Sequence, residues 1–245
     1  MSETKVAYVL VGGKGTRLRS AVSDRPKPMA EVNGRPFLEH LLDYWISQGV
    51  EEFILCVGYM ADSISNYFQD AYRGARLKYS LDDGDLGTGG ALTKAMASFP
   101  QQASFLILNG DTFFSVRISE LESALTQSKA SWVMALFRSN DTQRYSPVAL
   151  DESHRVIEVG SPCKASRSTV EESLINGGVH LVKGDQLNRL SAEHGIPFST
   201  EEALAHMIQK EGLDLLGLPV EGEFIDIGTP SDYLRAQSLP AFLNG

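Results

Sequence analysis

Short apolar runs alternate with stretches of helical periodicity along the first half of the chain. Residues 6–11 form an apolar run that is too short and too rich in β-branched side chains for a helix, which predicts a buried strand. Similar runs predict further strands at residues 53–57, 77–81, 105–108 and 132–137. Apolar residues recur at helical spacing between them, which predicts helices at residues 35–48, 61–68, 91–97 and 118–127. Strands that are apolar on both faces and alternate with helices favour a Rossmann-like, doubly wound α/β fold with a mainly parallel sheet.

The pattern changes after about residue 138. Shorter strands separated by turns are predicted at residues 148–150, 156–159 and 175–182, and they resemble small antiparallel additions to the sheet. The remaining predicted elements are helices at 184–190, 201–209 and 231–239 and strands at 213–218 and 224–227. Because no proline- or serine-rich linker separates the halves, we expect a single domain, 1–245, with halves of about 1–138 and 139–245.

Composition and charge exclude several classes of protein. The 245 residues carry a formal net charge of −9, which argues against a nucleic-acid backbone as the main partner. No apolar run approaches the roughly 20 residues of a membrane span, and the polar N-terminus carries no secretion signal. Cys56 and Cys163 show no metal-ligand spacing. We therefore expect a reduced, cytoplasmic protein that binds neither nucleic acid nor membrane.

A glycine-rich turn after the first strand is the main candidate for chemistry. Residues 12–15 read Gly-Gly-Lys-Gly, and Arg17 and Lys27 follow. Glycine leaves backbone N–H groups open to a ligand, and the two cations can neutralise a polyphosphate. The turn is not a Walker loop, because Lys14 is followed by Gly15 in place of serine or threonine. It is not a dinucleotide motif either, because Leu18 stands where the last glycine is required.

A series of motifs in a fixed order resembles the sugar-1-phosphate nucleotidylyltransferases, and within them the branch that acts on manno-configured sugars. The motifs are Gly12-Gly13-x-Gly15-Thr16-Arg17-Leu18, Pro26-Lys27-Pro28-Met29, Val57-Gly58-Tyr59, Leu86-Gly87-Thr88-Gly89-Gly90, Asn109-Gly110-Asp111-Thr112, Asn176-Gly177-Gly178-Val179 and Ile225-Asp226-Ile227-Gly228-Thr229-Pro230. The resemblance covers nearly the whole chain and implies a GT-A-like nucleotidyltransferase fold. The second half of the chain would then bind the sugar.

The resemblance implies an Mg²⁺-dependent transferase that makes an NDP-sugar and pyrophosphate from a nucleoside triphosphate and a sugar 1-phosphate. GTP with a heptose or mannose 1-phosphate is the expected pair, and a thymidylyl-, uridylyl- or cytidylyltransferase acting on another sugar is the alternative. Such an enzyme would supply a precursor for a bacterial surface glycan such as lipopolysaccharide, capsule or S-layer. A homo-oligomer is compatible with the sequence.

Catalysis of nucleotidyl transfer consists mainly of positioning and charge neutralisation. The expected catalytic residues are Arg17, Lys27 and Asp111. Asp111 and Asp226 each end a predicted strand, and by resemblance they are the two metal ligands. The expected nucleotide-binding residues are Leu10, Gly12, Gly13, Gly15, Thr16, Arg17, Lys27, Asp82, Asp83, Gly87 and Thr88. Within this set we hypothesise that Asp82 or Asp83 accepts hydrogen bonds from guanine.

The sugar-phosphate side departs from the family pattern. The family carries a Glu-Lys pair after the strand at 156–159, and its lysine holds the sugar phosphate, but no such pair stands here. Lys164 or Arg167 could replace that lysine. The expected sugar-phosphate residues are Asn109, Gly110, Tyr145, Ser146, Lys164, Asn176 and Gly177. The missing pair also leaves open a second class of function, a non-catalytic nucleotide-sugar sensor on the same fold.

Overall fold

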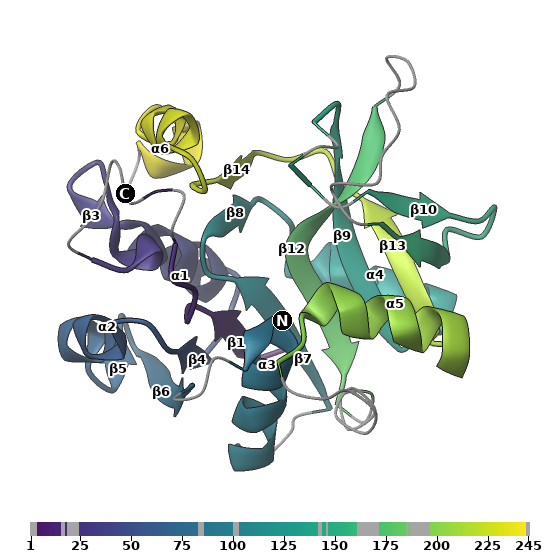
Figure 1. Cartoon of the computed structure of the whole chain (residues 1–245), viewed down its shortest axis with the longest axis horizontal. Coiled ribbons are helices and arrows are strands. Elements are labelled where there is room, and N and C mark those ends of the chain that lie inside the picture. Colours follow the sequence, from purple (N-terminus) through teal and green to yellow (C-terminus); the bar gives the residue numbers. More distant parts are fainter. Residues whose placement is uncertain are drawn as a thin grey trace.

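An eight-stranded sheet forms the centre of the molecule in the computed structural model (Figure 1), which describes residues 4–15, 18, 25–82, 86–99, 103–141, 144–145, 147–160, 172–184, 186 and 197–243. Its strands, in spatial order, are β13 (Leu215–Pro219), β9 (Trp132–Ser139), β12 (Ser173–Lys183), β7 (Ser104–Asn109), β1 (Val6–Leu10), β4 (Glu52–Val57), β6 (Ala75–Leu81) and β5 (Ala71–Tyr72). Strands β7, β1, β4 and β6 are parallel neighbours. The predicted parallel core is thereby confirmed.

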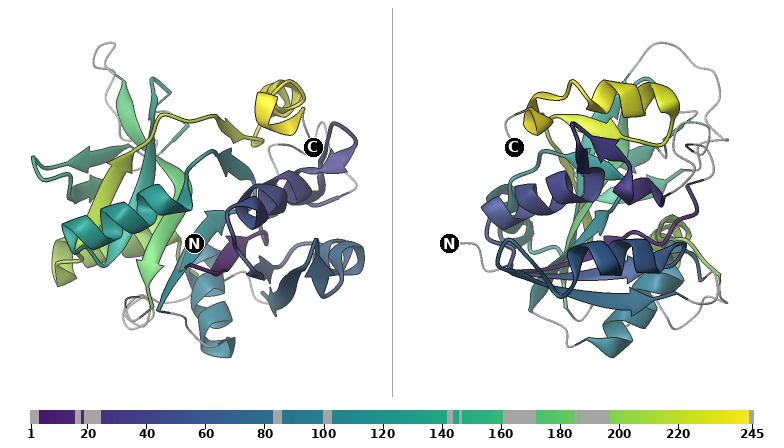
Figure 2. Two further views of the ribbon diagram at one scale, coloured as in Figure 1. Left: turned by 180° about the vertical axis from the view of Figure 1, so that it is seen from behind. Right: turned by 90° about the vertical axis from the view of Figure 1, so that its left-hand side faces the viewer.

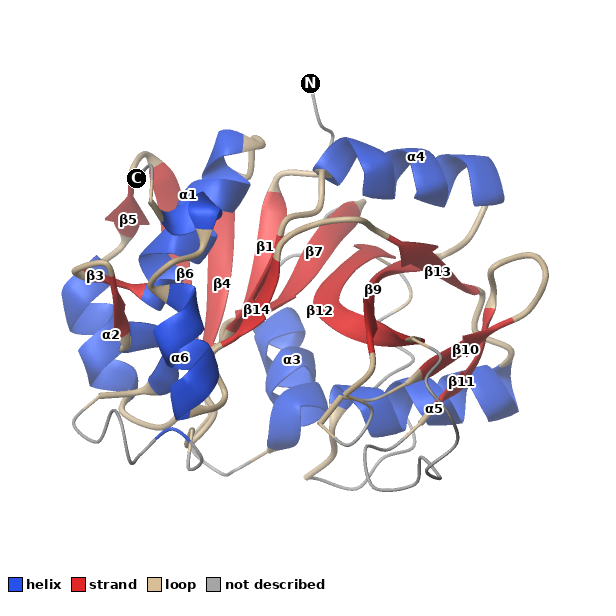
Figure 3. Cartoon of the chain, turned by 90° about the horizontal axis from the view of Figure 1, so that it is seen from above, coloured by secondary structure: helices blue, strands red, loops and turns tan. Residues whose placement is uncertain are grey.

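Helices cover both faces of this sheet (Figure 3). The apolar side chains of α1 (Phe37–Ser47), α2 (Ala61–Phe68) and α4 (Ile118–Ser128) share one core with Ala7 and Val9 of β1. Those of α3 (Gly87–Ser98) and α5 (Thr200–Glu211) share a second core, which contains Tyr8 of the same strand. Because successive residues of a strand point to opposite faces, one apolar run supplies both cores. The doubly wound α/β class predicted from the sequence is confirmed.

The position of β12 differs from the sequence prediction. The run at 175–182 was expected among small antiparallel additions, but β12 lies inside the main sheet, antiparallel to both β7 and β9. The small antiparallel elements are three two-stranded pairs among the described residues: β10 (Val148–Leu150) with β11 (Val156–Val159), β8 (Thr112–Phe114) with β14 (Phe224–Asp226), and β2 (Glu31–Val32) with β3 (Arg35–Pro36). Strand length and order depend on tertiary pairing, which an apolar run does not encode.

Helix α3 departs most from its predicted start, the C-terminal helix starts one residue earlier than predicted, and one further predicted helix lies mostly outside the described residues. Helix α3 starts at Gly87, four residues before the predicted start, so the glycine-rich segment forms its first turn. The C-terminal helix α6 (Pro230–Ala236) starts after Thr229, whose hydroxyl accepts from the N–H of Asp232 as an N-cap. The helix predicted at 184–190 lies mostly outside the described part of the chain.

The C-terminal part of the chain returns to the N-terminal half. Helix α6 lies beside β2 and β3, as both views of Figure 2 show, and Tyr233 Oη and Gln237 Nε2 donate to the carbonyl of Glu31. The 3₁₀ turn Pro240–Phe242 follows, and the ring of Phe242 packs against Phe37 and His40. In the described part of the chain, no helix has the length and apolar character that a membrane span requires.

A buried histidine gives the fold a predictable response to acid. His180 of β12 is 3% exposed, and its Nδ1 accepts from Trp132 Nε1 at 3.1 Å. Burial lowers the pKa of His180 from 6.5 to about 4. The unfolded chain therefore binds a proton that the folded chain rejects between these pH values, and stability is lost as pH falls from 6.5 towards 4.

The free energy of unfolding is measured in urea at pH 7 and at pH 5. Between these pH values we expect it to fall by about 2 kcal/mol more in the wild type than in His180→Gln, which retains an acceptor for Trp132 but does not titrate. His154→Asn, at an exposed position with φ of 61°, is the matched control and should keep the wild-type pH dependence. Equal pH dependence in wild type and His180→Gln would contradict this assignment.

Candidate active site

A cavity of about 380 Å³ opens at the carboxyl ends of the parallel strands. It gathers the end of β1, the glycine turn after it, the start of α3 and the segment after β7. The sequence-predicted nucleotide residues on its wall are Leu10, Gly12, Gly13, Gly15, Lys27, Asp82, Gly87 and Thr88. Asn109 and Asp111 also line it, whereas Thr16, Arg17 and Asp83 lie outside the described residues. The cavity occupies the place where ligands bind in open α/β sheets.

The glycine turn is shaped by close backbone packing. A Cβ at Gly12 would lie 3.2 Å from the amide nitrogen of Gly58, and the carbonyl of Gly12 accepts from the N–H of Tyr59. Gly15 adopts a φ of 56°, and a Cβ there would lie 3.1 Å from Cβ of Lys27. These contacts fix the turn against the end of β4 and against Lys27.

The glycines at the start of α3 are needed for close packing against Phe198, whereas a glycine-rich segment by itself suggests a ligand-binding loop. A Cβ at Gly87 would lie 2.3 Å from the carbonyl oxygen of Phe198, and one at Gly89 would lie 2.3 Å from Cε2 of the Phe198 ring. Backbone hydrogen bonds join the same segments, from Gly89 N to Phe198 O and from Phe198 N to Leu86 O, each 3.1 Å long. The glycines therefore let the segment before α5 close over the start of α3.

Asp82 is held at the other side of this helix start. Its carboxylate accepts from the N–H of Leu86, with oxygen–nitrogen distances of 3.0 and 3.3 Å. The side chain thus holds Leu86, the N-cap residue of α3, while it lines the cavity.

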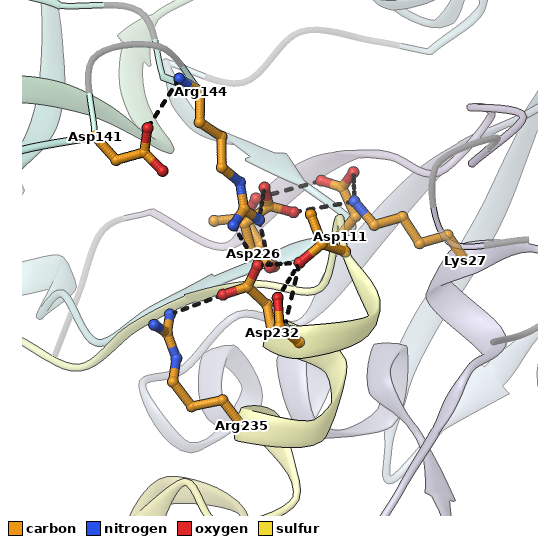
Figure 4. A network of polar contacts seen from close by, with 10 residues as sticks. Lys27, Asp111, Asp141, Arg144, Asp226, Asp232 and Arg235 are labelled. Atoms are coloured by element: carbon orange, nitrogen blue, oxygen red, sulfur yellow. Dashed lines mark hydrogen bonds and ion pairs between the residues drawn. The ribbon is translucent and has the colours of Figure 1, made fainter. Parts of the chain in front are cut away.

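Lys27 joins the two aspartates that were predicted as metal ligands (Figure 4). Its Nζ lies 2.7 Å from Oδ2 of Asp111 and 3.0 Å from Oδ1 of Asp226. The side chains of Lys27 and Asp226 are 8% and 13% exposed, whereas that of Asp111 is 40% exposed. The ammonium group therefore stands between the carboxylates, with Asp111 facing the open side of the cavity.

Local pairing explains why two distant segments meet here. Strand β8 begins directly after Asp111, and β14 ends at Asp226, with Asp226 opposite Thr112 in an antiparallel register. The N–H of Ile227 donates to the carbonyl of Asp111 at 3.1 Å. Lys27 enters from the short 3₁₀ turn Lys27–Met29. The sequence prediction that Lys27, Asp111 and Asp226 share one site agrees with this geometry.

Electrostatics keep Lys27 and Asp226 charged. Burial alone would lower the pKa of Lys27, but Asp111 and Asp226 outweigh burial and raise it above its ordinary value. Burial alone would raise the pKa of Asp226, but Lys27 and Arg144 outweigh that effect and lower it. The site is a compact arrangement of fixed charges.

Sequence reasoning missed Arg144. Its Nη2 donates to Oδ2 of Asp226 at 2.8 Å and to the carbonyl of the same residue at 3.0 Å, and its Nη1 pairs with Asp232. The guanidinium carbon lies 4.9 Å from the ring centre of Tyr145. The only signal for this residue was its position directly before Tyr145 and Ser146, two of the expected sugar-phosphate residues.

Sequence reasoning also missed Thr200 and Glu201 at the start of α5, which line the cavity opposite the glycine turn. Burial, with the nearby charges of Glu202 and Asp111, raises the pKa of Glu201. The N–H of Thr200 donates to Thr88 Oγ1 at 2.9 Å, so α5 is tied to α3 at the cavity wall. The capping box of Ser199 and Glu202 was a readable signal for this helix start, because serine and glutamate stand three residues apart.

The predicted sugar side is only partly described. Asn176 Oδ1 accepts from the N–H of Gly178 at 3.0 Å, which leaves the Asn176 side-chain amide as a donor. A Cβ at Gly177 would lie 2.4 Å from Cδ1 of Phe114, so no larger residue fits there. Likewise, a Cβ at Gly110 would lie 2.3 Å from Cγ1 of Val11. Ser146, Lys164 and Arg167 lie outside the described residues.

Tyr145 packs against the rings of Phe137 and Phe224, with ring centres 5.4 and 5.7 Å away. Burial, followed by the charge of Asp226, raises the pKa of the Tyr145 hydroxyl to about 12. The hydroxyl therefore remains protonated at neutral pH and can donate to a ligand.

The donor set fits a divalent cation that is shared with a substrate. Carboxylate oxygens are hard ligands, and the position between Asp111 and Asp226 already holds the ammonium cation of Lys27. Among the described residues, no group of three His, Cys, Asp or Glu side chains is arranged as a metal site. A magnesium ion at this pair would therefore take its other ligands from water and phosphate oxygens.

The chain belongs to the nucleotidyl transferase family, which matches residues 6–240. Members of this class transfer a nucleotidyl group, which agrees with a cavity that combines a glycine turn, a lysine and two aspartates. The sequence is 39% identical to D-glycero-alpha-D-manno-heptose 1-phosphate guanylyltransferase of Campylobacter jejuni over 227 residues, which cover 93% of this chain and 96% of that protein.

Further similarities agree with this assignment. The guanylyltransferase of the same name from Aneurinibacillus thermoaerophilus is 35% identical over 94% of this chain and 96% of its own length. The crystal structure of HddC from Yersinia pseudotuberculosis complexed with GMP-PN matches with a TM-score of 0.78 at 28% identity. That match covers 97% of this chain and 98% of HddC. The predicted family and enzyme class are confirmed.

Proposed function

We propose that the protein is a guanylyltransferase that makes GDP-D-glycero-D-manno-heptose and pyrophosphate from GTP and D-glycero-α-D-manno-heptose 1-phosphate. The observation that carries the proposal is the Lys27–Asp111–Asp226 cluster, in which Lys27 and Asp111 line a nucleotide-sized cavity. The choice of GTP and heptose rests on the two guanylyltransferases that this chain resembles over nearly their full lengths.

In the proposed reaction, a phosphate oxygen of the sugar 1-phosphate attacks the α-phosphorus of GTP. A new phosphorus–oxygen bond forms, the bond between the α-phosphorus and the bridging oxygen breaks, and the electron pair leaves with pyrophosphate. The N–H groups of residues 12–15 and the ammonium of Lys27 bind the triphosphate and neutralise the leaving group. Mg²⁺ bound by Asp111 and Asp226 would supply further charge neutralisation at the reacting phosphate.

The sugar side of the proposal uses Asn176, Tyr145 and Gly177. The Asn176 amide and the Tyr145 hydroxyl are donors for sugar oxygens, and Gly177 lets the backbone pack directly against the Phe114 ring. We infer that Arg17 and Lys164 or Arg167, together with Thr16 and Ser146, complete the phosphate contacts. We also infer a single-domain, cytoplasmic enzyme that supplies a precursor for a bacterial surface glycan.

Pyrophosphate release tests the proposal directly. Four nucleoside triphosphates are combined in turn with heptose, mannose, glucose and N-acetylglucosamine 1-phosphates in the presence of Mg²⁺. We expect the highest kcat/KM with GTP and the heptose 1-phosphate. A preference for mannose 1-phosphate or for another base would replace the substrate assignment. Nucleotide binding without pyrophosphate release for any pair would overturn the enzyme in favour of a sensor.

Asp82 provides a test of base recognition that spares the fold. The side-chain oxygen of asparagine accepts a hydrogen bond as a carboxylate oxygen does, so Asp82→Asn should keep the bond to Leu86 N and unfold as the wild type does. If the carboxylate accepts the N–H groups of guanine, the preference for GTP over ATP should fall about tenfold or more. The same measurement on Asp62→Asn, outside the cavity on α2, is the control. An unchanged preference in Asp82→Asn would exclude Asp82 as the guanine acceptor.

A further inference from the structure

The two oxygens of the Asp226 carboxylate are used by different cations. Oδ1 receives the ammonium of Lys27 at 3.0 Å, and Oδ2 receives Nη2 of Arg144 at 2.8 Å. Nη2 of Arg144 also donates to the Asp226 main-chain carbonyl at 3.0 Å. A guanidinium that grips both the carboxylate and the carbonyl of one residue restrains the side-chain torsions of that residue.

Arg144 is itself held in place from the opposite side. Its Nη1 pairs with Asp232 of α6, whose side chain is 9% exposed and also accepts from the hydroxyl of Thr229. Its main-chain N–H donates to the side chain and the carbonyl of Asp141. Figure 4 shows the resulting chain of contacts from α6 through Arg144 to Asp226, Lys27 and Asp111. Arg144 therefore links the segment before Tyr145 to the pair of aspartates.

The space around Asp226 leaves its carboxylate little freedom. A Cβ at Gly228 would lie 2.9 Å from both carboxylate oxygens and 3.3 Å from Nη2 of Arg144. The carboxylate is thus packed between the backbone of residue 228 on one side and the two cations on the others. Oδ1 shares the ammonium of Lys27 with Oδ2 of Asp111, so the position between these two oxygens is where a cation sits.

We propose that Arg144 is a positioning residue for the metal site: it occupies Oδ2 of Asp226 and thereby presents Oδ1, with Asp111, to a divalent cation. This inference rests on the proposed function, because it assumes that a divalent cation binds Asp111 and Asp226. Residues that orient a metal ligand typically contribute 10- to 100-fold to metal affinity. Arg144 acts through Asp226 and does not itself contact the reacting atoms.

The sign of the effect separates positioning from simple charge balance. A guanidinium near a divalent cation repels it, so a variant without that positive charge would bind the cation more tightly if charge were all that mattered. If Arg144 positions Asp226, its removal should weaken cation binding even though a repulsive charge is lost. Loss of Arg144 also leaves Asp226 and Asp232 close together without the cation between them, which displaces the carboxylate further.

The experiment measures Mn²⁺ binding by electron paramagnetic resonance in the full chain, with a non-hydrolysable GTP analogue present at saturation. We expect Arg144→Met to weaken Mn²⁺ binding about 10- to 100-fold and Arg144→Lys to weaken it less, because lysine keeps a positively charged donor group. Arg235→Met is the matched control, since Arg235 is 57% exposed and pairs with Asp232 at 3.4 Å without touching Asp226. Its Mn²⁺ affinity should stay within about twofold of the wild type.

Two reference variants make each outcome decisive. Thermal unfolding shows whether Arg144→Met is folded. If it is not, Arg144→Lys is measured in its place, and Mn²⁺ binding by Arg144→Lys that is equal to or tighter than that of the wild type overturns the inference. Equal or tighter binding in a folded Arg144→Met overturns it as well. Asp111→Asn tests the underlying metal site: if it binds Mn²⁺ as the wild type does, the metal assignment of the proposed function fails, and the positioning inference fails with it.

Discussion

Asp111→Asn is expected to lower the rate of nucleotidyl transfer by roughly 10³-fold while the protein stays folded. The change removes one of two carboxylates that would hold the metal, and metal-based charge stabilisation at a phosphoryl group is worth several kcal/mol. At about 1.4 kcal/mol for each factor of ten, that loss corresponds to the expected fall in rate. Single-turnover pyrophosphate release at saturating GTP and Mg²⁺ measures it.

The same substitution should cost little stability. Asp111 is 40% exposed, and Lys27 keeps its second partner, Asp226, so the expected change in the free energy of unfolding is about 1 kcal/mol or less. Asp214→Asn is a suitable control, because Asp214 is 46% exposed and pairs with Arg155 away from the cavity. Near-normal turnover in Asp111→Asn would show that the metal is bound elsewhere. The corresponding change at Asp226 is less informative, because it would leave two buried cations without their shared carboxylate.

Lys27→Met is expected to have opposite effects on catalysis and on metal binding. Loss of the ammonium removes a charge-assisted donor from the triphosphate, and we expect kcat to fall about 10²- to 10³-fold. In the absence of nucleotide, the ammonium competes with a divalent cation for the same two carboxylates, 2.7 and 3.0 Å from Nζ. The variant should therefore bind Mn²⁺ more tightly than the wild type when GTP is absent.

Rate and affinity need to be measured on the same preparation of Lys27→Met. Lys27→Arg, which keeps the positive charge, should retain the weak metal binding of the nucleotide-free wild type. Weaker Mn²⁺ binding in Lys27→Met would mean that the lysine organises the carboxylates and does not compete for them. A fall in kcat of less than tenfold would remove Lys27 from the catalytic group.

Elements that are defined by neighbouring residues were predicted from the sequence, whereas elements that depend on distant partners were not. Strand β1 and helix α2 were predicted within one residue because apolar spacing alone defines them. The start of α3 was misplaced because its glycines pack against Phe198, a partner more than a hundred residues away that no local pattern announces. The central place of β12 was missed for the same reason, since strand order follows from pairing across the sheet.

The residues of the candidate site show the same difference between local and distant features. Lys27, Asp111 and Asp226 were named from motifs that run along the chain, and the antiparallel pairing of β8 with β14 brings them together. Arg144 belongs to no recognised motif, and its role is visible only through its bonds to Asp226 and Asp232. Glu201 was overlooked because a glutamate in the first turn of a helix is common as a favourable partner of the helix dipole.

The position of Lys27 also bears on how the protein can be handled in the laboratory. When two carboxylates are neutralised only by a metal, removal of the metal makes them repel each other and lowers the stability of the surrounding chain. Here the ammonium of Lys27, whose side chain is 8% exposed, stands between Asp111 and Asp226 and balances their charge without a metal. Chelating agents such as EDTA should therefore stop turnover without lowering the melting temperature, and the metal-free protein can be purified, stored and reactivated by adding magnesium.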